Sequence, residues 1–436
     1  MGGELRANRT VRANRTGLAD VDAQWAAGEL SGLARAAAFG ARPEAEVWAA
    51  AARGGDEQRW CAAVALGGAG RYAAAAGLLR GLITGPDPLF AALAGATLAA
   101  HRRQLGAHAA ARRLDSAALA RLSELGRPPD LARLSGLGHP PDLARLSGLG
   151  RPPDLAGRSA PRPGSVPQAA RGCPDSVATR PGAPAEPAGS DSAAPGSREP
   201  AGSPVDHPDV ANEPVHSIDL PAGLSARTAL DPDSIDLAGA WSDVLLGLAA
   251  DAVGLGEVER ARRTHAFAER VSARAEAAGW APGWRPRVRA CWIGAEIELS
   301  AGAAERALGW AERAAELARS APSTRHRVKS ALVLSAALVA ADTTVGRRRA
   351  GELLREALTS SLGRGIFSLA WPSALLLADL TPDSAPKFDK IASDALTRCF
   401  VGSDAEMRCL AASSPWVPTH LVRSGEPTRT SGELAS

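Results

Sequence analysis

Apolar residues recur along much of the chain with the three-to-four-residue spacing of amphipathic helices, and no useful run shows the two-residue alternation of a β-strand. Gly, Pro and Asp residues bound most of these runs, where they commonly begin or end a helix. The expected helices before residue 123 follow Asp20 and end at Gly40, and then lie at residues 43–54, 56–67, 71–83, 87–105 and 107–122. Those expected after residue 234 lie at residues 236–254, 257–278, 286–301, 303–320, 324–341, 347–360, 365–379, 384–400 and 403–412. Since the connections are short, neighbouring helices should be antiparallel, and we predict an all-α fold of stacked helical hairpins.

A Pro-rich segment separates the two helical parts. Of the 32 prolines, 20 lie between Gly126 and Ser234, where apolar periodicity is absent. Such a segment has too little apolar surface to offset the entropy lost on ordering, so we predict a disordered linker at residues 123–234. The linker includes a 12-residue tandem repeat at residues 122–157. The near-identity of its copies favours a recent duplication over an array that docks a Pro-recognising partner.

These boundaries divide the chain into five regions. We expect a disordered basic tail at residues 1–16 and a second disordered tail at residues 413–436. The helical regions are then residues 17–122 and 235–412. Short loops inside each region and a long linker between them leave two arrangements open: one continuous solenoid, or two bodies joined by a tether.

Composition and charge exclude several classes of protein. The chain is Ala-, Gly-, Pro- and Arg-rich, as in a GC-rich bacterial genome, and its net charge of +3 is spread without a strongly basic segment. It has no run of about 18 uncharged apolar residues and no apolar signal-peptide core. The five cysteines are scattered without zinc-ligand spacing. We expect a cytoplasmic protein with reduced thiols, without a membrane segment, metal or other cofactor.

A short pattern repeats at the predicted hairpin turns. A glycine is followed five residues later by an alanine, where a small residue lets the second helix press against the first. The pairs are Gly70/Ala75, Gly256/Ala261 and Gly302/Ala307, with Val345/Ala350 as a weaker copy. The C-terminal copies are 46 and 43 residues apart, a period in the range of helical solenoids.

These turns, with apolar or small residues at the following helical positions, resemble the tetratricopeptide-repeat (TPR) superfamily in its longer-period form, as in helical sensor and scaffold regions of bacterial regulators. The resemblance covers about residues 43–85 and 240–360, and Trp60 and Trp292 fall within one position of the family's Trp. The family's Leu-Gly and Tyr are mostly absent. The resemblance implies a peptide-binding surface lined by the first helix of each hairpin. Matched residue by residue, that surface holds Arg289, Trp292, Glu296 and Ser300 in one hairpin and Glu57, Trp60 and Val64 in the N-terminal one. Of these, the expected partner-binding residues are Trp60, Arg289, Trp292, Glu296 and Ser300. The alternative for both Trp residues is burial between helices.

A second candidate surface is cationic. Arg and Lys cluster in the first turns of predicted helices, where the helix dipole disfavours positive charge. The expected ridge consists of Arg325, Arg327, Lys329, Arg347, Arg348 and Arg349. Such a ridge would suit an acidic peptide or a nucleic acid, although solvated helix ends explain the same pattern.

Motifs for catalysis are absent from the sequence: it has no phosphate-binding loop, zinc-protease helix, nucleophile elbow or dinucleotide fingerprint. We therefore expect a non-enzymatic scaffold that binds a peptide or protein partner on its helical surface. The alternatives are a helical sensor region associated with transcription control and a binder of an anionic partner through the ridge. The oligomeric state is left open by the sequence.

Overall fold

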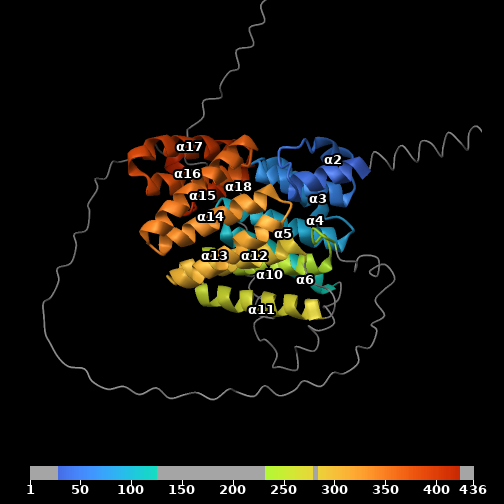
Figure 1. Ribbon diagram of the computed structural model, residues 1–436. Helices are drawn as coiled ribbons and strands as arrows, with labels where there is room; N and C mark the ends of the chain where they lie inside the picture. The colour runs from blue at the N-terminus through green and yellow to red at the C-terminus, as the bar shows by residue number, and fades with distance from the viewer. Residues whose placement is uncertain (1–27, 125–230, 278–282, 423–436) are drawn as a thin grey trace, which may run out of the picture. The chain divides into compact units, whose positions relative to one another are not determined.

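The computed structural model describes residues 28–124, 231–277 and 283–422, and within these ranges every regular element is a helix (Figure 1). The predicted all-α fold class is therefore confirmed. Consecutive helices pack against one another, an arrangement compatible with a helical solenoid. The predicted tail at residues 1–16 and residues 125–230 of the predicted linker, with nearly all of its repeats, lie outside the described residues. At its two ends the prediction of a disordered linker is wrong: residues 123 and 124 belong to a helix, and residues 231–234 are held because Asp231 and Asp233 pair with Arg35.

The helices agree closely with the sequence pattern. Residues 28–39 are helical, and the helices that follow before residue 125 are α2 (Trp48–Arg53), α3 (Asp56–Gly68), α4 (Tyr72–Ile83), α5 (Pro88–Gln104) and α6 (His108–Glu124). The α-helices after residue 230 are α10 (Leu237–Gly254), α11 (Val258–Ala277), α12 (Trp284–Ser300), α13 (Ala304–Ser320), α14 (Thr324–Ala340), α15 (Thr344–Gly363), α16 (Phe367–Leu380), α17 (Ala385–Val401) and α18 (Ala405–Ala412). Two short 3₁₀ turns accompany them, η2 (Pro382–Ser384) and η3 (Thr419–Leu421).

Most helices pair as antiparallel hairpins. In the described ranges these are α3/α4, α5/α6, α10/α11, α12/α13, α14/α15 and α16/α17. Four of the turns share one arrangement, in which a glycine with φ between 70° and 75° ends the first helix. The next residue then donates its N–H to the carbonyl oxygen five residues earlier. These glycines are Gly70, Gly106, Gly256 and Gly302. Since only glycine adopts this left-handed conformation without steric cost, the turn explains why glycine stands there.

The alanine that follows each of these glycines by five residues lies at the contact between the paired helices. Each of the four is fully buried: Ala75, Ala111, Ala261 and Ala307. A larger side chain at these positions would hold the two helices apart, so the glycine–alanine step is a packing requirement of the hairpin. The pair Gly106/Ala111 follows the same rule, although it is not among the pairs predicted from the sequence.

The α14/α15 turn departs from the sequence expectation. The residue with a left-handed backbone is Asp342, with φ of 50°, and Val345 is exposed in the first turn of α15. Thr343 caps α15 instead, since its hydroxyl accepts a hydrogen bond from the Gly346 N–H at 3.0 Å. The assignment of Val345 to the glycine position is therefore wrong, because an aspartate upstream takes the left-handed conformation that valine disfavours. Ala350 is buried, as the repeat requires.

Helix α10 joins the two helical parts of the chain. It packs against α5 and α6 on one side and against α11 and α12 on the other. Among the described helices it alone is long and apolar enough to cross a membrane, and 72% of it is buried. It also carries Asp243 and Asp251, both buried and paired with arginines. This is the environment of a core helix.

The C-terminal helices return to the N-terminal hairpins. The Ala73 N–H donates to the Gly402 carbonyl at 2.7 Å, and the Ser368 hydroxyl donates to the Gly68 carbonyl at 2.9 Å. Arg102 on α5 forms an ion pair with Glu406 on α18 at 2.8 Å. With α10 against α5 and α6, these contacts close the run of described helices on itself (Figure 1).

Part of the expected C-terminal tail is built into this closure. Residues 413–422 are described: the Ser414 hydroxyl donates to the Gly106 carbonyl at 3.1 Å, and the Trp416 indole N–H donates to the Gly254 carbonyl at 3.2 Å. Val417 is buried. The prediction of a disordered tail from residue 413 is therefore wrong for these ten residues, because their apolar side chains and polar groups find partners on other helices.

A glycine at the closure gives a first test. A Cβ atom at Gly402 would lie 2.1 Å from the Gly70 carbonyl oxygen. Since both contacting groups belong to the backbone, no side-chain rotation relieves the overlap. We expect Gly402→Ala to lower the free energy of unfolding by about 1–3 kcal/mol and to speed hydrogen exchange at the Ala73 amide.

Gly77 on α4 provides the matched control, because a Cβ atom there would meet nothing within 4 Å. Gly77→Ala should therefore stabilise the protein by about 0.5–1 kcal/mol through its effect on helix entropy. Urea unfolding of the two variants measures both values. A Gly402→Ala protein as stable as the wild type would contradict the described closure.

Candidate functional site

The first helices of the hairpins surround one cavity of about 580 Å³, which we call the inner cavity. Its lining comes mainly from α3, α5, α10, α12, α14 and α16, and the second helices contribute only His108, at the start of α6. Ser300 and Trp416 are exposed lining residues and mark the opening to solvent. Alternate helices therefore present their side chains to a single space.

All five residues expected to bind a partner line the inner cavity: Trp60, Arg289, Trp292, Glu296 and Ser300. The two Trp side chains are also buried, with exposed fractions of 1% and 9%. The Trp60 indole N–H donates to the Thr97 hydroxyl at 2.9 Å, and that of Trp292 donates to the Ser330 hydroxyl at 2.8 Å. Both rings thus pack between helices, as the alternative supposed, and form part of the cavity wall.

Four of these residues belong to α12, and their spacing places them on the same face of that helix. Arg289, Trp292, Glu296 and Ser300 are three or four residues apart, which places them on one face of a helix. Glu296 forms an ion pair with Lys329 on α14 at 2.7 Å, which ties neighbouring first helices together across the wall.

The structure does not form the predicted cationic ridge as one surface. Arg325 and Lys329 face the inner cavity, whereas Arg327 lies two positions from each on another face of α14. The three arginines of α15 are exposed, and each has an acidic partner: Arg347 pairs with Asp342, Arg348 with Glu352 and Arg349 with Glu312. The prediction of a single ridge is wrong because residues two apart on a helix point in different directions.

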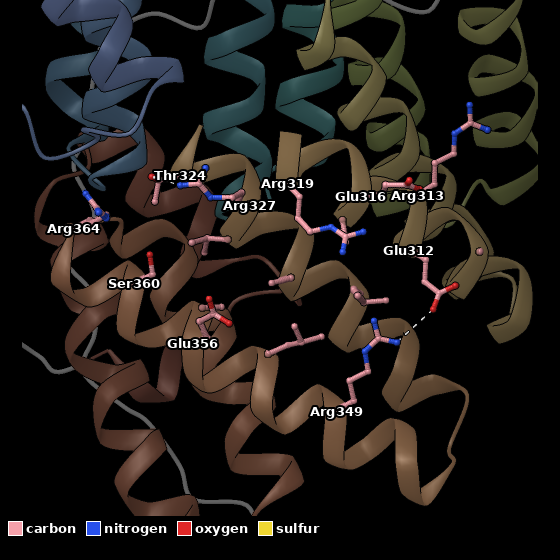
Figure 2. Close-up of a pocket in the computed structure, with 17 residues that line it drawn as sticks. Glu312, Arg313, Glu316, Arg319, Thr324, Arg327, Arg349, Glu356, Ser360 and Arg364 are labelled. Carbon is pink, nitrogen blue, oxygen red and sulfur yellow. Dashed lines mark hydrogen bonds and ion pairs between the residues drawn. The ribbon is translucent and has the colours of Figure 1, made fainter. Parts of the chain in front are cut away.

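Arg327 and Arg349 instead line a groove of about 910 Å³ between α13 and α15, with α14 as its floor (Figure 2). Its arginines are Arg313, Arg319, Arg327, Arg349 and Arg364, and its acidic residues are Glu312, Glu316 and Glu356. Figure 2 shows the 3.6 Å ion pair of Arg349 with Glu312 across the groove. The α13–α15 groove is therefore lined by five arginines and three glutamates.

A buried aspartate holds two arginines at the wall of the inner cavity. Asp243 on α10 pairs with Arg285 and with Arg289, both on α12. Burial opposes ionisation of Asp243, but the two guanidinium groups outweigh it and hold its pKa below the ordinary value. One negative charge therefore serves two positive charges at this point.

Arg103 on α5 lies in the reverse situation. It pairs with Asp115 at 2.5 Å and with Asp251 at 3.0 Å, and both carboxyl groups are fully buried. Burial raises the pKa of both aspartates, against the effect of Arg103. Gly247 provides the space, because a Cβ atom there would lie 2.3 Å from an Asp115 oxygen. This cluster fastens α5, α6 and α10 together beside the cavity.

Three histidines of the cavity wall are neutral at physiological pH. Burial, together with Arg325 and other cations, lowers the pKa of His101 to about 3. Burial and Arg103 lower that of His108 to about 4, and burial and Arg325 lower that of His326. The positive charge of the wall is therefore carried by its Arg and Lys side chains alone.

Sequence reasoning missed the residues that hold this wall together, notably Arg103, Asp243 and Asp251. A signal was present, since Asp243 and Asp251 are charged residues inside the apolar segment 237–254. Charged groups on a buried helix need oppositely charged partners. The identity of those partners depends on helices far away in the sequence.

Among the described residues, no group of three or more His, Cys, Asp or Glu side chains is arranged to hold a metal ion. Comparisons with protein-family models, with curated proteins and with solved structures found no match to this chain.

Proposed function

We propose that the protein is a non-enzymatic interaction scaffold of TPR-like type, which binds a segment of a partner protein in the inner cavity. The observation that carries the proposal is that six of the seven residues matched to the family's binding surface line one cavity, whereas Glu57 pairs with Arg35 outside it. They come from helices α3 and α12, which belong to different hairpins. The same turn geometry in four hairpins of this chain, with a glycine in the left-handed conformation and a buried alanine five residues later, supports the TPR-like assignment.

The state of the buried cysteines among the described residues supports a non-enzymatic role, whereas Cys409 is exposed and lies away from the inner cavity lining. Burial raises the pKa of Cys291 to about 11 and that of Cys399 to about 12, so both are protonated near pH 7. A protonated, buried thiol is a weak nucleophile. The polar groups near the cavity serve instead to hold helices together.

Site-specific photo-crosslinking of the full-length protein in its native cells tests the proposal. A photoreactive phenylalanine analogue at the position of Ser300 stands at the cavity opening, and the same analogue at the position of Arg348 stands on the exposed face of α15. We expect a defined crosslinked partner at the first position only, with a lower yield when Glu296→Arg reverses charge inside the cavity. Identical products at both positions would contradict a partner site in the inner cavity.

The volume of the inner cavity favours a second function, the sensing of a small ligand by a regulatory region. About 580 Å³ lies within the range of roughly 300–1,000 Å³ that small-molecule sites occupy. A sensor would bind such a ligand in the purified protein, without a partner. Binding through the six-residue cationic ridge has no comparable support, because the structure divides those residues between surfaces.

A further inference from the structure

Arg325 is a cation on the wall of the inner cavity that lacks an acidic partner. One guanidinium N–H donates to the Val64 carbonyl at 3.0 Å, and the side chain packs against Gly68, where a Cβ atom would lie 3.3 Å from the guanidinium nitrogen. It forms no ion pair with any carboxylate of the described residues. Burial and the nearby Arg289 lower its pKa. The site is therefore one at which an anion would relieve an uncompensated charge.

The surroundings of Arg325 add to this positive charge. Arg289 shares the single carboxylate of Asp243 with Arg285, and Lys329 is balanced by Glu296. In ion pairs, the arginines of α12 and α14 at this wall thus have one carboxylate between them, while the histidines are uncharged. Asp115 of the neighbouring cluster also acts on Arg289, which leaves Arg325 as the cation farthest from compensation. Removing a ligand's negative charge from water is least costly where such fixed cations replace the solvent.

Polar atoms without partners lie on the same wall. The Nδ1 atoms of His101 and His108 and the indole N–H of Trp371 are buried and have no hydrogen-bond partner. All three residues line the inner cavity. Each of these atoms is itself shielded, and the Nδ1 atom of His108 lies so close to Gly254 that a Cβ atom there would be 2.1 Å from it. They therefore make this wall polar behind its surface, while Arg325 is the group that a ligand would meet.

The rest of the wall is apolar and aromatic. Trp292 stacks on His326 with ring centroids 5.1 Å apart, and Trp60, Trp371 and Leu369 lie on other parts of the lining. Flat rings and aliphatic side chains offer contact area to an apolar part of a ligand. They offer no hydrogen bonds to replace those that a strongly hydrated ligand makes with water.

We propose that the inner cavity binds an organic anion with an apolar or aromatic body, whose negative group is held by Arg325 with Arg289 nearby and whose body contacts Trp292 and Trp371. The inference rests on the proposed function to the extent that the inner cavity is the binding site. Two sources share this chemistry: a free small organic acid, and an acidic group next to an apolar side chain in a partner segment.

Isothermal titration of the purified full-length protein with naphthalene-1-acetate and with its neutral analogue naphthalene-1-acetamide is the test. The two probes have the same aromatic body and differ in charge. We expect the acid to bind at least about tenfold more tightly than the amide, as expected for a charge-assisted hydrogen bond in a buried site. Equal affinities, or tighter binding of the amide, would overturn the proposal, and this comparison needs no variant.

Variants locate the charge. Arg325→Gln should weaken binding of the acid by about tenfold or more without changing binding of the amide, and Arg325→Lys should retain most of the affinity. Arg348→Gln is the matched control, since that side chain is exposed on α15, and it should leave both probes unaffected. Binding of the acid that survives Arg325→Gln in a protein with a wild-type circular dichroism spectrum would also overturn the proposal.

Competition distinguishes the two sources. The competitor is a short peptide with an acidic residue beside Trp. If a partner segment supplies the anion, this peptide should displace naphthalene-1-acetate and bind with higher affinity than the free acid. If a small molecule supplies the anion, the free acid should bind more tightly than the peptide. Failure of the scaffold function has a different signature: the acid binds and depends on Arg325, but no crosslinked partner forms at the position of Ser300. Crosslinking at Ser300 together with failure of the acid–amide comparison would retain the scaffold and reject the anion.

Discussion

Replacing Arg103 with glutamine is expected to lower the free energy of unfolding by about 3–5 kcal/mol near pH 7.5. The guanidinium group is the cation that contacts both Asp115 and Asp251, and the side chains of both aspartates are fully buried in the fold. Glutamine can still donate one hydrogen bond, but it leaves two buried carboxyl groups without a positive charge. The loss should appear in urea or thermal unfolding of the full-length protein.

The effect of Arg103→Gln should depend on pH in a defined direction. Both aspartates have a pKa raised in the folded protein, so the folded state binds more protons than the unfolded state above about pH 4. Their contribution to stability is therefore present at low pH and is lost as pH rises through the folded pKa. Arg103 lowers the pKa of both aspartates, so without it their stability contribution falls further as pH rises. The free energies of unfolding of the variant and the wild type should therefore differ less at pH 5 than at pH 8.

Arg348→Gln is the control for this experiment as well. Arg348 has a side chain that is 74% exposed and pairs with Glu352 one helical turn away. We expect its replacement to cost no more than about 0.5 kcal/mol, with little dependence on pH. Equal losses in the two arginine variants would contradict the assignment of Arg103 to a buried ionic cluster.

Replacing Trp60 with alanine is expected to cost about 3–5 kcal/mol of stability. The ring is 1% exposed, packs on Phe39 at a centroid distance of 5.4 Å and lies below the guanidinium of Arg285 at 5.7 Å. Its indole N–H also bonds to Thr97 on α5. Truncation would therefore leave a cavity at the contact between two hairpins.

Two variants separate the contributions of Trp60. Trp60→Phe keeps most of the packing and removes the bond to Thr97, so its cost should be about 1 kcal/mol. Trp48→Ala removes an indole that is 43% exposed and should cost well below the value for Trp60→Ala. Chemical denaturation of the three proteins decides the matter, and a Trp60→Ala loss as small as that of Trp48→Ala would show that the ring contributes little to the core.

Most helices of the fold could be predicted from local sequence. The starts and ends at residues 56–68 and 304–320 follow the apolar period together with Asp, Gly and Ser at the boundaries. The main departure is α2, which begins at Trp48 instead of Pro43. A favourable first-turn proline permits a helix there, but it does not supply the apolar contacts that stabilise one.

The candidate site could be predicted in part. Spacing placed four residues on one face of α12, and the family resemblance implied that this face belongs to a surface lined by first helices. The cationic ridge failed because local charge density says nothing about direction: Arg325 and Arg327 are neighbours in sequence but line different spaces. The contributions of Trp371 and Trp416 could not be predicted, because they depend on contacts between segments far apart in the sequence, such as the bond from Trp416 to Gly254 on α10.

The sequence by itself determined the all-α class, the positions of the hairpin turns and the small residues inside them, because these depend on interactions within about five residues. Gly70 and Ala75 have the same roles wherever the hairpin lies. Only the tertiary structure decided that α10 joins the two helical parts, that residues 413–422 belong to the fold and that alternate helices enclose one cavity with Arg325 on its wall. Those features depend on which helix faces meet across the long linker, and such pairing is governed by packing and by buried charge rather than by local periodicity.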